Sequence, residues 1–248
     1  MKNKLKTICI IPARGGSKGL IKKNIRKLNG HPLIAYPISA AIRSKVCDKI
    51  FVSTDDKQIA VQAKKYGADV PFLRSYDYAK DDTTTENTLK EALISYEKYF
   101  NTSFDICVYL TATDIFRNPQ WIKIAVNNLK SNNKIESSFV ANATHKNYWH
   151  YNKHKVPKRI LSKMKNYSSR QTKEPIYRED TGLACASRSF LWRKGKRIGN
   201  NIKLIINNFT ETNIDIHTEY DLFLANKIIE YFKKNCPKKI PYIRLKKK

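Results

Sequence analysis

Short apolar runs and amphipathic segments alternate along the first half of the chain. The apolar runs are typical of buried strands, and the segments between them carry apolar residues at helical spacing. They form four pairs of a predicted strand followed by a predicted helix: 7–11 with 33–44, 49–53 with 57–66, 68–73 with 86–99, and 105–110 with 119–131. This alternation predicts an α/β fold with a parallel sheet whose strands are joined by crossover helices.

The second half of the chain follows the pattern less regularly. Four further strands are predicted over 137–141, 182–186, 202–206 and 213–216. A closing helix is predicted over 219–233. Residues 142–180 are polar, aromatic and basic without clean periodicity, so they are predicted to form an insertion. No repeat or linker divides the chain, which predicts a single domain over 1–248 with the insertion at about 142–180.

The chain is strongly basic. It has 48 lysines and arginines against 21 aspartates and glutamates, a net charge of +27. A field of that size attracts polyanions such as nucleic acid, a membrane surface or phosphorylated ligands, and does not choose among them. The lysines are spread along a sequence rich in Lys, Asn and Ile, which genomic base composition explains equally well. Without a recognition motif or a single basic stripe, the sequence disfavours nucleic acid as the partner.

Membrane insertion and secretion are also disfavoured. The apolar run 8–11 meets Pro12 before it could form a signal-peptide core, and the stretch 33–42 falls short of the roughly 20 apolar residues that span a bilayer. The five cysteines occur singly, with no pair at zinc-ligand spacing, as expected for residues in a reducing compartment. The sequence therefore predicts a soluble, cytoplasmic protein.

A basic, glycine-rich loop follows the first predicted strand. Its candidate ligand-binding residues are three cationic side chains, two of its glycines and a hydroxyl: Arg14, Lys18, Lys23, Gly15, Gly16 and Ser17. Glycine lets the backbone approach a ligand, while the cations and the hydroxyl can hydrogen-bond to a triphosphate. The loop is neither a Walker A motif nor a dinucleotide fingerprint. A basic surface turn is the alternative, but open α/β sheets bind ligands at this end of their strands.

The segment from Ile11 to Gly19, with Lys23 and Asn24, resembles the N-terminal signature of the CMP-sialic acid synthetases, also called acylneuraminate cytidylyltransferases. The resemblance covers most of the chain and is weakest over 120–165. It continues in 52–56, 63–68, Arg74 and 81–83, and it resumes in 170–171, 177–178 and 215–221.

The resemblance implies a Rossmann-like nucleotidyltransferase fold, with a mostly parallel sheet, helices on both of its faces and a small dimerisation insertion. It also implies a homodimer and a Mg²⁺-dependent reaction. In that family the anomeric hydroxyl of an acidic nine-carbon sugar attacks the α-phosphate of CTP, and pyrophosphate leaves. The expected partners are CTP and an acidic nonulosonic acid, either sialic acid or a modified relative.

Carried over position by position, the resemblance assigns roles to individual residues. Arg14 and Lys23 would be catalytic together with Asp215, the metal carboxylate. The nucleotide would be held by Arg14, Gly15, Gly16, Ser17, Lys18, Asn24 and Arg74. The sugar would meet residues of later segments, namely Thr113, Arg170, Arg178, Asp180 and His217. These assignments suit a transfer that is accelerated by cations around developing charge rather than by a protein nucleophile.

The chain departs from the family pattern at the metal site. The second metal carboxylate of the family falls on His217, two positions after Asp215, and histidine is a poor Mg²⁺ ligand. Asp215 could act with phosphates and waters alone, or with help from Asp221 or Glu219. His217 could be a sugar contact, a proton acceptor or a structural histidine. Asp215 itself could instead cap the last helix.

Two loops expected beside the sugar also depart from the family pattern. The segment 111–117 keeps only a threonine and an arginine, and 178–182 places two acids where an amide is usual. The nucleotide assignment therefore has more support than the sugar assignment, and the altered loops favour a modified nonulosonic acid. The alternatives are a cytidylyltransferase of the CMP-Kdo synthetase type, a basic nucleic-acid-binding protein, or a non-catalytic subunit that has lost the second carboxylate.

Overall fold

The computed structural model describes residues 4–161, 171, 173–243 and 245. The described strands of the central sheet are β1 (Thr7–Pro12), β4 (Lys49–Ser53), β5 (Ile106–Tyr109), β6 (Ser137–Thr144), β9 (Ile176–Glu179), β10 (Cys185–Arg188) and β11 (Ile202–Asn207). Six of them follow the order β11-β6-β10-β5-β1-β4, and β9 pairs with β6 beyond the end of β10. Two short hairpins lie outside this sheet: β2 (Lys27–Leu28) with β3 (His31–Pro32), and β7 (Trp149–Tyr151) with β8 (Pro157–Arg159).

Most of the sheet is parallel. β1 is parallel to β4 and β5, and β11 is parallel to β6. β10 is antiparallel to both β5 and β6, so β4, β1, β5, β6 and β11 all run in one direction. The predicted mostly parallel sheet is confirmed, with β10 and β9 as the strands that run against the common direction.

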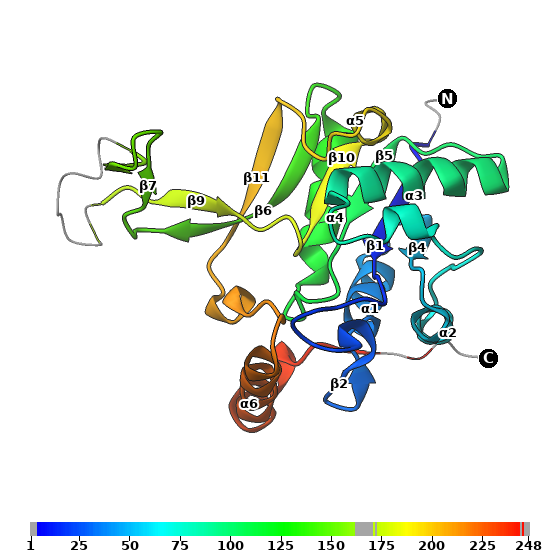
Figure 1. Cartoon of the computed structure of the whole chain (residues 1–248), viewed down its shortest axis with the longest axis horizontal. Coiled ribbons are helices and arrows are strands. Elements are labelled where there is room, and N and C mark those ends of the chain that lie inside the picture. Colours follow the sequence, from blue (N-terminus) through cyan, green and yellow to red (C-terminus); the bar gives the residue numbers. More distant parts are fainter. Residues whose placement is uncertain (1–3, 162–170, 172, 244, 246–248) are drawn as a thin grey trace.

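Helices cover both faces of the sheet (Figure 1). They are α1 (Ala35–Ser44), α2 (Lys57–Tyr66), α3 (Thr85–Phe100), α4 (Pro119–Ser131), α5 (Ser189–Arg193) and α6 (Glu219–Asn235). Short 3₁₀ turns occur at Lys23–Ile25, Tyr76–Tyr78, Thr210–Asn213 and Pro237–Lys239. Within the described residues, no helix is both long and apolar enough to cross a membrane.

The sheet has an apolar core on each of its two faces, which explains why its strands are apolar throughout. Successive side chains of a strand point to opposite faces of the sheet. Ile11 and Val52 pack with α1, α2 and α4 on one face, whereas Ile10 and Phe51 pack with α3 and α5 on the other. The predicted placement of helices on both faces is confirmed.

The last helix covers the loop that follows β1. α6 begins with a capping box formed by Thr218 and Asp221. Its buried face, which includes Leu222, packs in a separate apolar cluster with Leu20 and Leu33. α6 therefore holds the segment after β1 against the last part of the chain, and this packing brings two of the predicted site segments together.

Two of the predicted strands are wrong. Over 68–73, only Asp69 pairs with Phe51 as an isolated bridge, and Pro71 then lacks the N–H that a longer ladder needs. Over 213–216 the chain leaves a 3₁₀ turn and crosses the end of the sheet, where the Ile216 N–H lies 3.4 Å from the Thr113 carbonyl oxygen. Both segments are apolar because they pack against the core, not because they extend the sheet.

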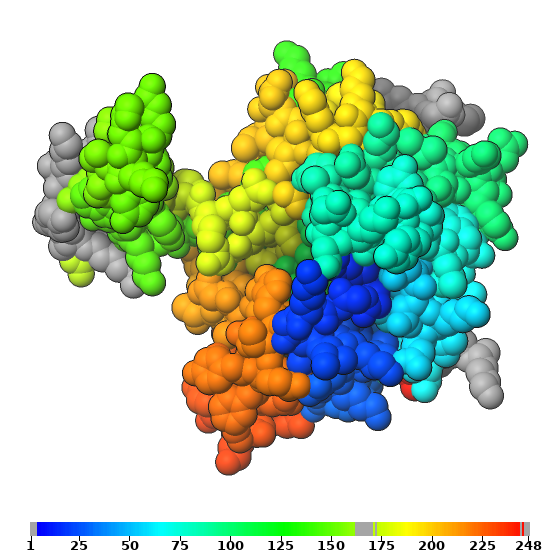
Figure 2. Space-filling view, viewed as in Figure 1, coloured from blue at the N-terminus to red at the C-terminus, as the bar shows by residue number. Residues whose placement is uncertain are grey.

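Part of the predicted insertion is an arm that projects from the body. Beyond β10, β6 continues to Thr144 and pairs with β9, and the β7–β8 hairpin lies farther out (Figures 1 and 2). Two aromatic side chains of this hairpin, Trp149 and Tyr151, are 54% and 74% exposed. The arm therefore presents aromatic surface away from the sheet.

Candidate active site

Loops from four parts of the chain meet at the carboxyl edge of the parallel strands. The segments 13–24 and 54–56 follow β1 and β4, and 111–117 follows β5. Because β10 runs in the opposite direction, the segment 180–184 that precedes it reaches the same edge. Ligands of open α/β sheets bind at this edge.

The glycine-rich loop after β1 is fixed by the loop after β4. The Gly15 N–H donates to Asp55 Oδ1 at 2.9 Å. A β-carbon on Gly15 would lie 2.9 Å from Asp56 Oδ2, closer than real side chains approach, so this position requires glycine. A β-carbon on Gly16 would meet nothing within 4 Å. The loop is therefore closed on one side and open to a ligand on the other.

The far end of the same loop is held by Asn24 and by the segment before α6. The Asn24 side-chain amide donates to the Arg14 carbonyl oxygen at 2.8 Å, which closes the loop. A β-carbon on Gly19 would lie 2.7 Å from the His217 carbonyl oxygen. The two backbones thus touch, and His217 is a neighbour of the glycine-rich loop.

Two loop cations share one carboxylate. Arg14 Nη1 lies 2.7 Å from Asp81 Oδ1, and Lys18 Nζ lies 2.6 Å from Asp81 Oδ2. The hydrogen bond from Lys18 is the largest cause that holds the pKa of Asp81 below its usual value. Asp81 is half-exposed, and exposed ion pairs are weak, so an incoming phosphate can compete for both cations.

Arg74 is buried beside this loop with nitrogens to spare. Its side chain is only 6% exposed, and Nη1 donates to the Tyr78 carbonyl oxygen at 3.3 Å. Nε and Nη2 are buried and have no hydrogen-bond partner among the described residues. Burial lowers the pKa of Arg74, an effect opposed by the nearby charge of Asp55. A buried guanidinium with two unmatched donors is suited to binding an acceptor on a ligand.

Lys23, Asp215 and His217 lie on the other side of the loop. Burial lowers the pKa of Lys23, the charges of Asp215 and Asp221 oppose this, and the charge of Arg14 adds to it. The four charged groups are therefore close enough to interact. His217 Nε2 lies 2.8 Å from Asp215 Oδ2, and the Asp215 side chain is 47% exposed. Asp215 thus offers one oxygen to the site while the other meets the imidazole.

The donor set fits a magnesium ion only in company with phosphate oxygens. No group of three or more His, Cys, Asp or Glu side chains in the described part of the chain could hold a metal. Glu219 is bound by Arg26 at 2.6 and 2.8 Å, and Asp221 accepts from the N–H groups of His217 and Thr218 at the start of α6. Mg²⁺ is commonly held by one or two carboxylates plus substrate phosphates and waters. Asp215 can be such a carboxylate.

A cleft of about 280 Å³ opens beside Asp215, between the segment after β5 and the segment before β10. Figure 2 shows it between the yellow-green residues of β9 and the blue glycine-rich loop. Its charged lining residues are four carboxylates and one guanidinium: Asp114, Glu179, Asp180, Asp215 and Arg178. This lining is acidic although the whole chain is strongly basic.

The guanidinium in the cleft is already occupied. Arg178 donates from Nε and Nη2 to the two carboxylate oxygens of Asp180, both at 3.0 Å, and Nη2 also donates to Asn213 Oδ1 at 2.9 Å. The hydrogen bond to Asp180 is the largest cause that raises the pKa of Arg178. The Arg178 fork is therefore turned toward the protein, and the predicted contact with the sugar would require this pair to open.

Arg117 joins the loop after β5 to the loop before β10. It is buried and donates to the carbonyl oxygens of Thr111 at 2.9 Å, of Gly182 at 2.6 Å, and of Leu183. Burial lowers its pKa to about 10, and the charge of Asp114 opposes the shift. These bonds join residues 182–183 to the loop after β5, and the strand predicted over 182–186 begins only at Cys185.

Comparisons with known proteins agree with this arrangement. Residues 8–246 match the family model described as cytidylyltransferase. The chain belongs to the cytidylyltransferase family. It is 34% identical over 230 residues to CMP-N,N'-diacetyllegionaminic acid synthase of Legionella pneumophila, a match that covers 91% of this chain and 97% of the relative. It is 33% identical over 224 residues to post-translational flagellin modification protein B of Campylobacter coli, covering 90% and 93% of the two chains.

Other similarities are partial or structural. N-acylneuraminate cytidylyltransferase of Escherichia coli is 40% identical over 121 residues, which is 49% of this chain and 27% of that protein. The structure of CMP:2-keto-3-deoxy-manno-octonic acid synthetase complexed with CTP superposes with a TM-score of 0.67 at 13% identity, covering 91% and 99% of the chains. At that identity the superposition supports the Rossmann-like nucleotidyltransferase fold and nothing finer.

The fold of this cytidylyltransferase brings most of the predicted site residues to one edge of the sheet. The glycine-rich loop contributes Arg14, Gly15, Gly16, Ser17, Lys18, Lys23 and Asn24. Thr113 is buried in the loop after β5 and its carbonyl oxygen faces the Ile216 N–H, next to Asp215. Arg170 lies outside the described residues.

Several residues of this edge carry no role in the sequence prediction. They are Asp55, Asp81, Tyr109, Asp114, Arg117 and Arg197. Arg117 left a signal, because it is one of two family residues that the segment 111–117 retains. Asp55 and Asp81 also left a signal, because they lie in 52–56 and 81–83, where the family resemblance continues. Tyr109, Asp114 and Arg197 depend on contacts between distant segments, which no single stretch of sequence displays.

Proposed function

We propose that the protein transfers CMP from CTP to the anomeric hydroxyl of an acidic nonulosonic acid and releases pyrophosphate. The observation that carries this proposal is the glycine-rich loop, whose two cations rest on the exchangeable carboxylate of Asp81 beside the unmatched donors of Arg74. The acidic cleft next to it would take the sugar. The names of the Legionella pneumophila relative and of the N-acylneuraminate cytidylyltransferase support the same chemistry.

In the proposed reaction, one phosphate ester bond forms while one phosphoanhydride bond breaks. The sugar oxygen bonds to the α-phosphorus, and the bond from that phosphorus to the oxygen shared with the β-phosphate breaks, so pyrophosphate leaves with the electron pair. Arg14 and Lys23 would stabilise the charge that develops on the phosphates. Nearby phosphate would also counter the effect of burial on the pKa of Lys23 and keep this side chain cationic.

We propose that the imidazole of His217 accepts the proton that the anomeric hydroxyl of the sugar loses. In the tautomer that donates from Nε2 to Asp215 Oδ2, at 2.8 Å, the carboxylate orients the ring and Nδ1 remains free to accept a proton. The same Asp215 would hold Mg²⁺ through its other oxygen, and the bound ion would supply positive charge to the phosphates. The replacement of a family carboxylate by His217 is then a change of role rather than a loss of activity.

The arm supports a homodimer. The β7–β8 hairpin lies away from the body (Figure 1), and its aromatic side chains Trp149 and Tyr151 are mostly exposed, so a second copy of the chain could bury them. The protein would work in the cytoplasm, because CTP is an intracellular nucleotide and all five cysteines are free thiols, as expected in a reducing compartment.

Pyrophosphate release tests the proposed function. Purified protein with Mg²⁺ is supplied with each nucleoside triphosphate in turn, against a panel of nonulosonic acids and octulosonic acids of the Kdo type. We expect release with CTP and a nonulosonic acid only, loss of release on chelation of the metal, and loss in Arg14→Ala. Release with an octulosonic acid alone would favour the CMP-Kdo synthetase type. Activity gained from zero in His217→Asp would identify a chain that had lost catalysis.

A further inference from the structure

Tyr109 places an unmatched hydroxyl in the acidic cleft. It is the last residue of β5 and is only 8% exposed, yet it lines the cleft. Within the part of the chain that the structure describes, its hydroxyl makes no hydrogen bond. Burial raises the pKa of Tyr109 to about 12, so the hydroxyl keeps its proton at neutral pH. A hydroxyl donor on the wall of a cleft, without a partner among the described residues, is suited to a ligand.

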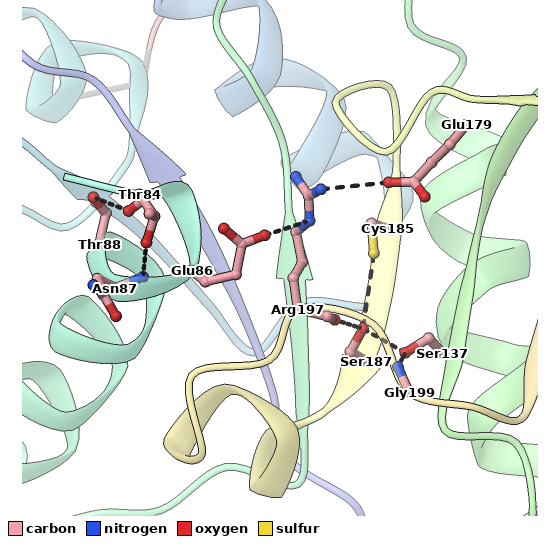
Figure 3. Close-up of polar contacts among 10 residues, drawn as sticks. All are labelled: Thr84, Glu86, Asn87, Thr88, Ser137, Glu179, Cys185, Ser187, Arg197 and Gly199. Atoms are coloured by element: carbon pink, nitrogen blue, oxygen red, sulfur yellow. Dashed lines mark hydrogen bonds and ion pairs between the residues drawn. The ribbon is translucent and has the colours of Figure 1, made fainter. Parts of the chain in front are cut away.

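Arg197 stands over the ring of Tyr109. Its guanidinium carbon lies 5.3 Å from the ring centroid. Nη2 lies 3.3 Å from Glu179 on the cleft wall, and Nε lies 3.6 Å from Glu86 in the first turn of α3 (Figure 3). Both distances exceed the 2.7–2.9 Å typical of strong charge-assisted hydrogen bonds. Nη1 makes no such contact with the described residues. The guanidinium is thus held loosely on two sides and keeps donors for a ligand.

The backbone beneath Arg197 is firmly fixed. Its carbonyl oxygen accepts a hydrogen bond from Ser187 Oγ at 2.6 Å, and Ser187 Oγ lies 2.9 Å from Ser137 Oγ (Figure 3). Ser137 Oγ in turn accepts from the Gly199 N–H at 3.0 Å. This network ties the loop after α5 to β10 and β6, so Arg197 occupies a defined place beside Glu179 and Tyr109, two residues that line the cleft.

The local charge decides which acceptor can bind there. The single charge of Arg197 faces the carboxylates of both Glu86 and Glu179, and the cleft beyond contains Asp114 and Asp180. A carboxylate brought into this surrounding would meet more negative than positive charge. A neutral acceptor, such as a carbonyl oxygen, avoids that repulsion and still satisfies Tyr109 and Arg197.

We propose that Tyr109 and Arg197 determine sugar specificity by donating hydrogen bonds to the carbonyl oxygen of an acylamino substituent. The sugar carboxylate would then face the opposite side of the cleft, toward Lys23 and Arg14. This inference rests on the proposed function and names the two residues of the same site that select the substrate. Neither residue is needed for the phosphate chemistry.

The test compares two sugars that differ at one substituent. A nonulosonic acid with an acetamido group and its analogue with hydroxyl in that place are each assayed with saturating CTP. For the wild type, kcat/KM should favour the acetamido sugar. In Tyr109→Phe and in Arg197→Gln, we expect that preference to fall roughly two- to tenfold, the range for one lost hydrogen bond, with KM for CTP unchanged.

A matched control comes from another arginine. Arg193 pairs with Glu97 at 2.6 Å outside the cleft lining, so Arg193→Gln removes a guanidinium and an ion pair without touching the sugar. We expect this variant to keep the sugar preference. Arg197→Lys, which retains a donor, should restore part of the preference that Arg197→Gln loses.

Three outcomes would overturn the inference. An unchanged sugar preference in both variants would remove Tyr109 and Arg197 from specificity. An equal loss for both sugars in Arg197→Gln would assign the guanidinium to a group that the sugars share, such as the carboxylate. Absence of turnover by the wild type with CTP and every nonulosonic acid would overturn the proposed function itself, and this inference with it. If Arg197→Gln fails to fold, Tyr109→Phe, which deletes one oxygen atom, decides the matter.

Discussion

In the candidate site, individual carboxylates form ion pairs with the cationic side chains and so affect their availability to a ligand. Asp81 contacts Arg14 and Lys18 from an exposed position, whereas Asp180 binds both nitrogens of the Arg178 fork within the cleft. The first arrangement can yield to a phosphate, because solvent already screens it. The second leaves Arg178 little freedom. The same type of contact therefore has opposite consequences on the nucleotide and sugar sides.

Replacing Asp81 should strengthen CTP binding. Asp81→Asn removes the charge that competes for Arg14 and Lys18, so we expect the Kd for CTP to fall by roughly two- to fivefold, the range for an exposed ion pair. Titration calorimetry measures this directly. Asp77→Asn is the control, because Asp77 pairs with Lys80 outside the glycine-rich loop. Weaker binding in Asp81→Asn would mean that Asp81 arranges the cations for CTP instead of competing with it.

The two loop glycines should respond differently to one methyl group. In Gly15→Ala the new β-carbon would lie 2.9 Å from Asp56 Oδ2, so the loop must shift, and we expect CTP affinity to drop by roughly tenfold or more. In Gly16→Ala the β-carbon meets nothing, and the unliganded protein should keep its melting temperature. Thermal unfolding and CTP titration of both variants check this. A larger loss of melting temperature in Gly16→Ala than in Gly15→Ala would contradict the described loop geometry.

At the scale of elements, the sequence predicts helices and strands from their periodic apolar spacing, but it does not predict features that depend on residues far away in the chain. The helices predicted over 57–66 and 119–131 have the same bounds as the observed α2 and α4. Their apolar spacing and their N-caps, Asp56 and Asn118, are local features of the sequence. The antiparallel direction of β10 follows from its pairing with the distant strands β5 and β6, and Arg117 binds Gly182 just before β10 across 65 residues of chain. The nucleotide loop was predictable as one contiguous motif, whereas the cleft beside it is assembled from three distant segments, 109–114, 178–182 and 212–215.

The loop after β5 should make stability depend on pH. Burial raises the pKa of Asp114 above its ordinary value of 3.8, and the charge of Arg117 opposes the shift. The folded state then holds this proton more tightly than the unfolded state. Its contribution to stability is fully present below the unfolded pKa and is lost as the pH rises through the folded pKa.

Asp114→Asn provides the comparison. Over a pH series from about 4 to 7, we expect the free energy of unfolding of the wild type to fall relative to that of Asp114→Asn, as the buried carboxyl loses its proton. Urea unfolding at each pH measures both. Parallel curves, or a wild type that gains stability as the pH rises, would show that Arg117 keeps Asp114 ionised in the fold.

At the scale of the whole molecule, charge and shape separate two tasks. The net charge of +27 attracts phosphorylated ligands in general, while the acidic lining of the cleft excludes them from the place where a sugar would bind. The arm is distinct from both. Its surface combines exposed aromatic rings with lysines, and it extends away from the body (Figure 1). We therefore connect the arm with assembly and not with nucleotide binding.

We expect a partner to stabilise the β7–β8 hairpin. Each of its strands has three residues, and an isolated two-stranded hairpin is marginally stable in water. Arg159 stacks on Trp149 at 4.4 Å, yet more than half of this indole stays exposed, as does most of Tyr151. Burying these rings against a second copy of the chain would supply the apolar contact that the hairpin lacks.

We therefore expect the wild type to be a dimer by light scattering and the double variant Trp149→Asp with Tyr151→Asp to be a monomer. A charged side chain at an interface core must lose its water without gaining a partner, which opposes association. Tyr220→Asp is the matched control, because Tyr220 is 67% exposed on α6, away from the arm. A monomeric wild type would refute the dimer. A double variant that remains dimeric would place the interface elsewhere, and the exposed rings of the arm would then need another partner.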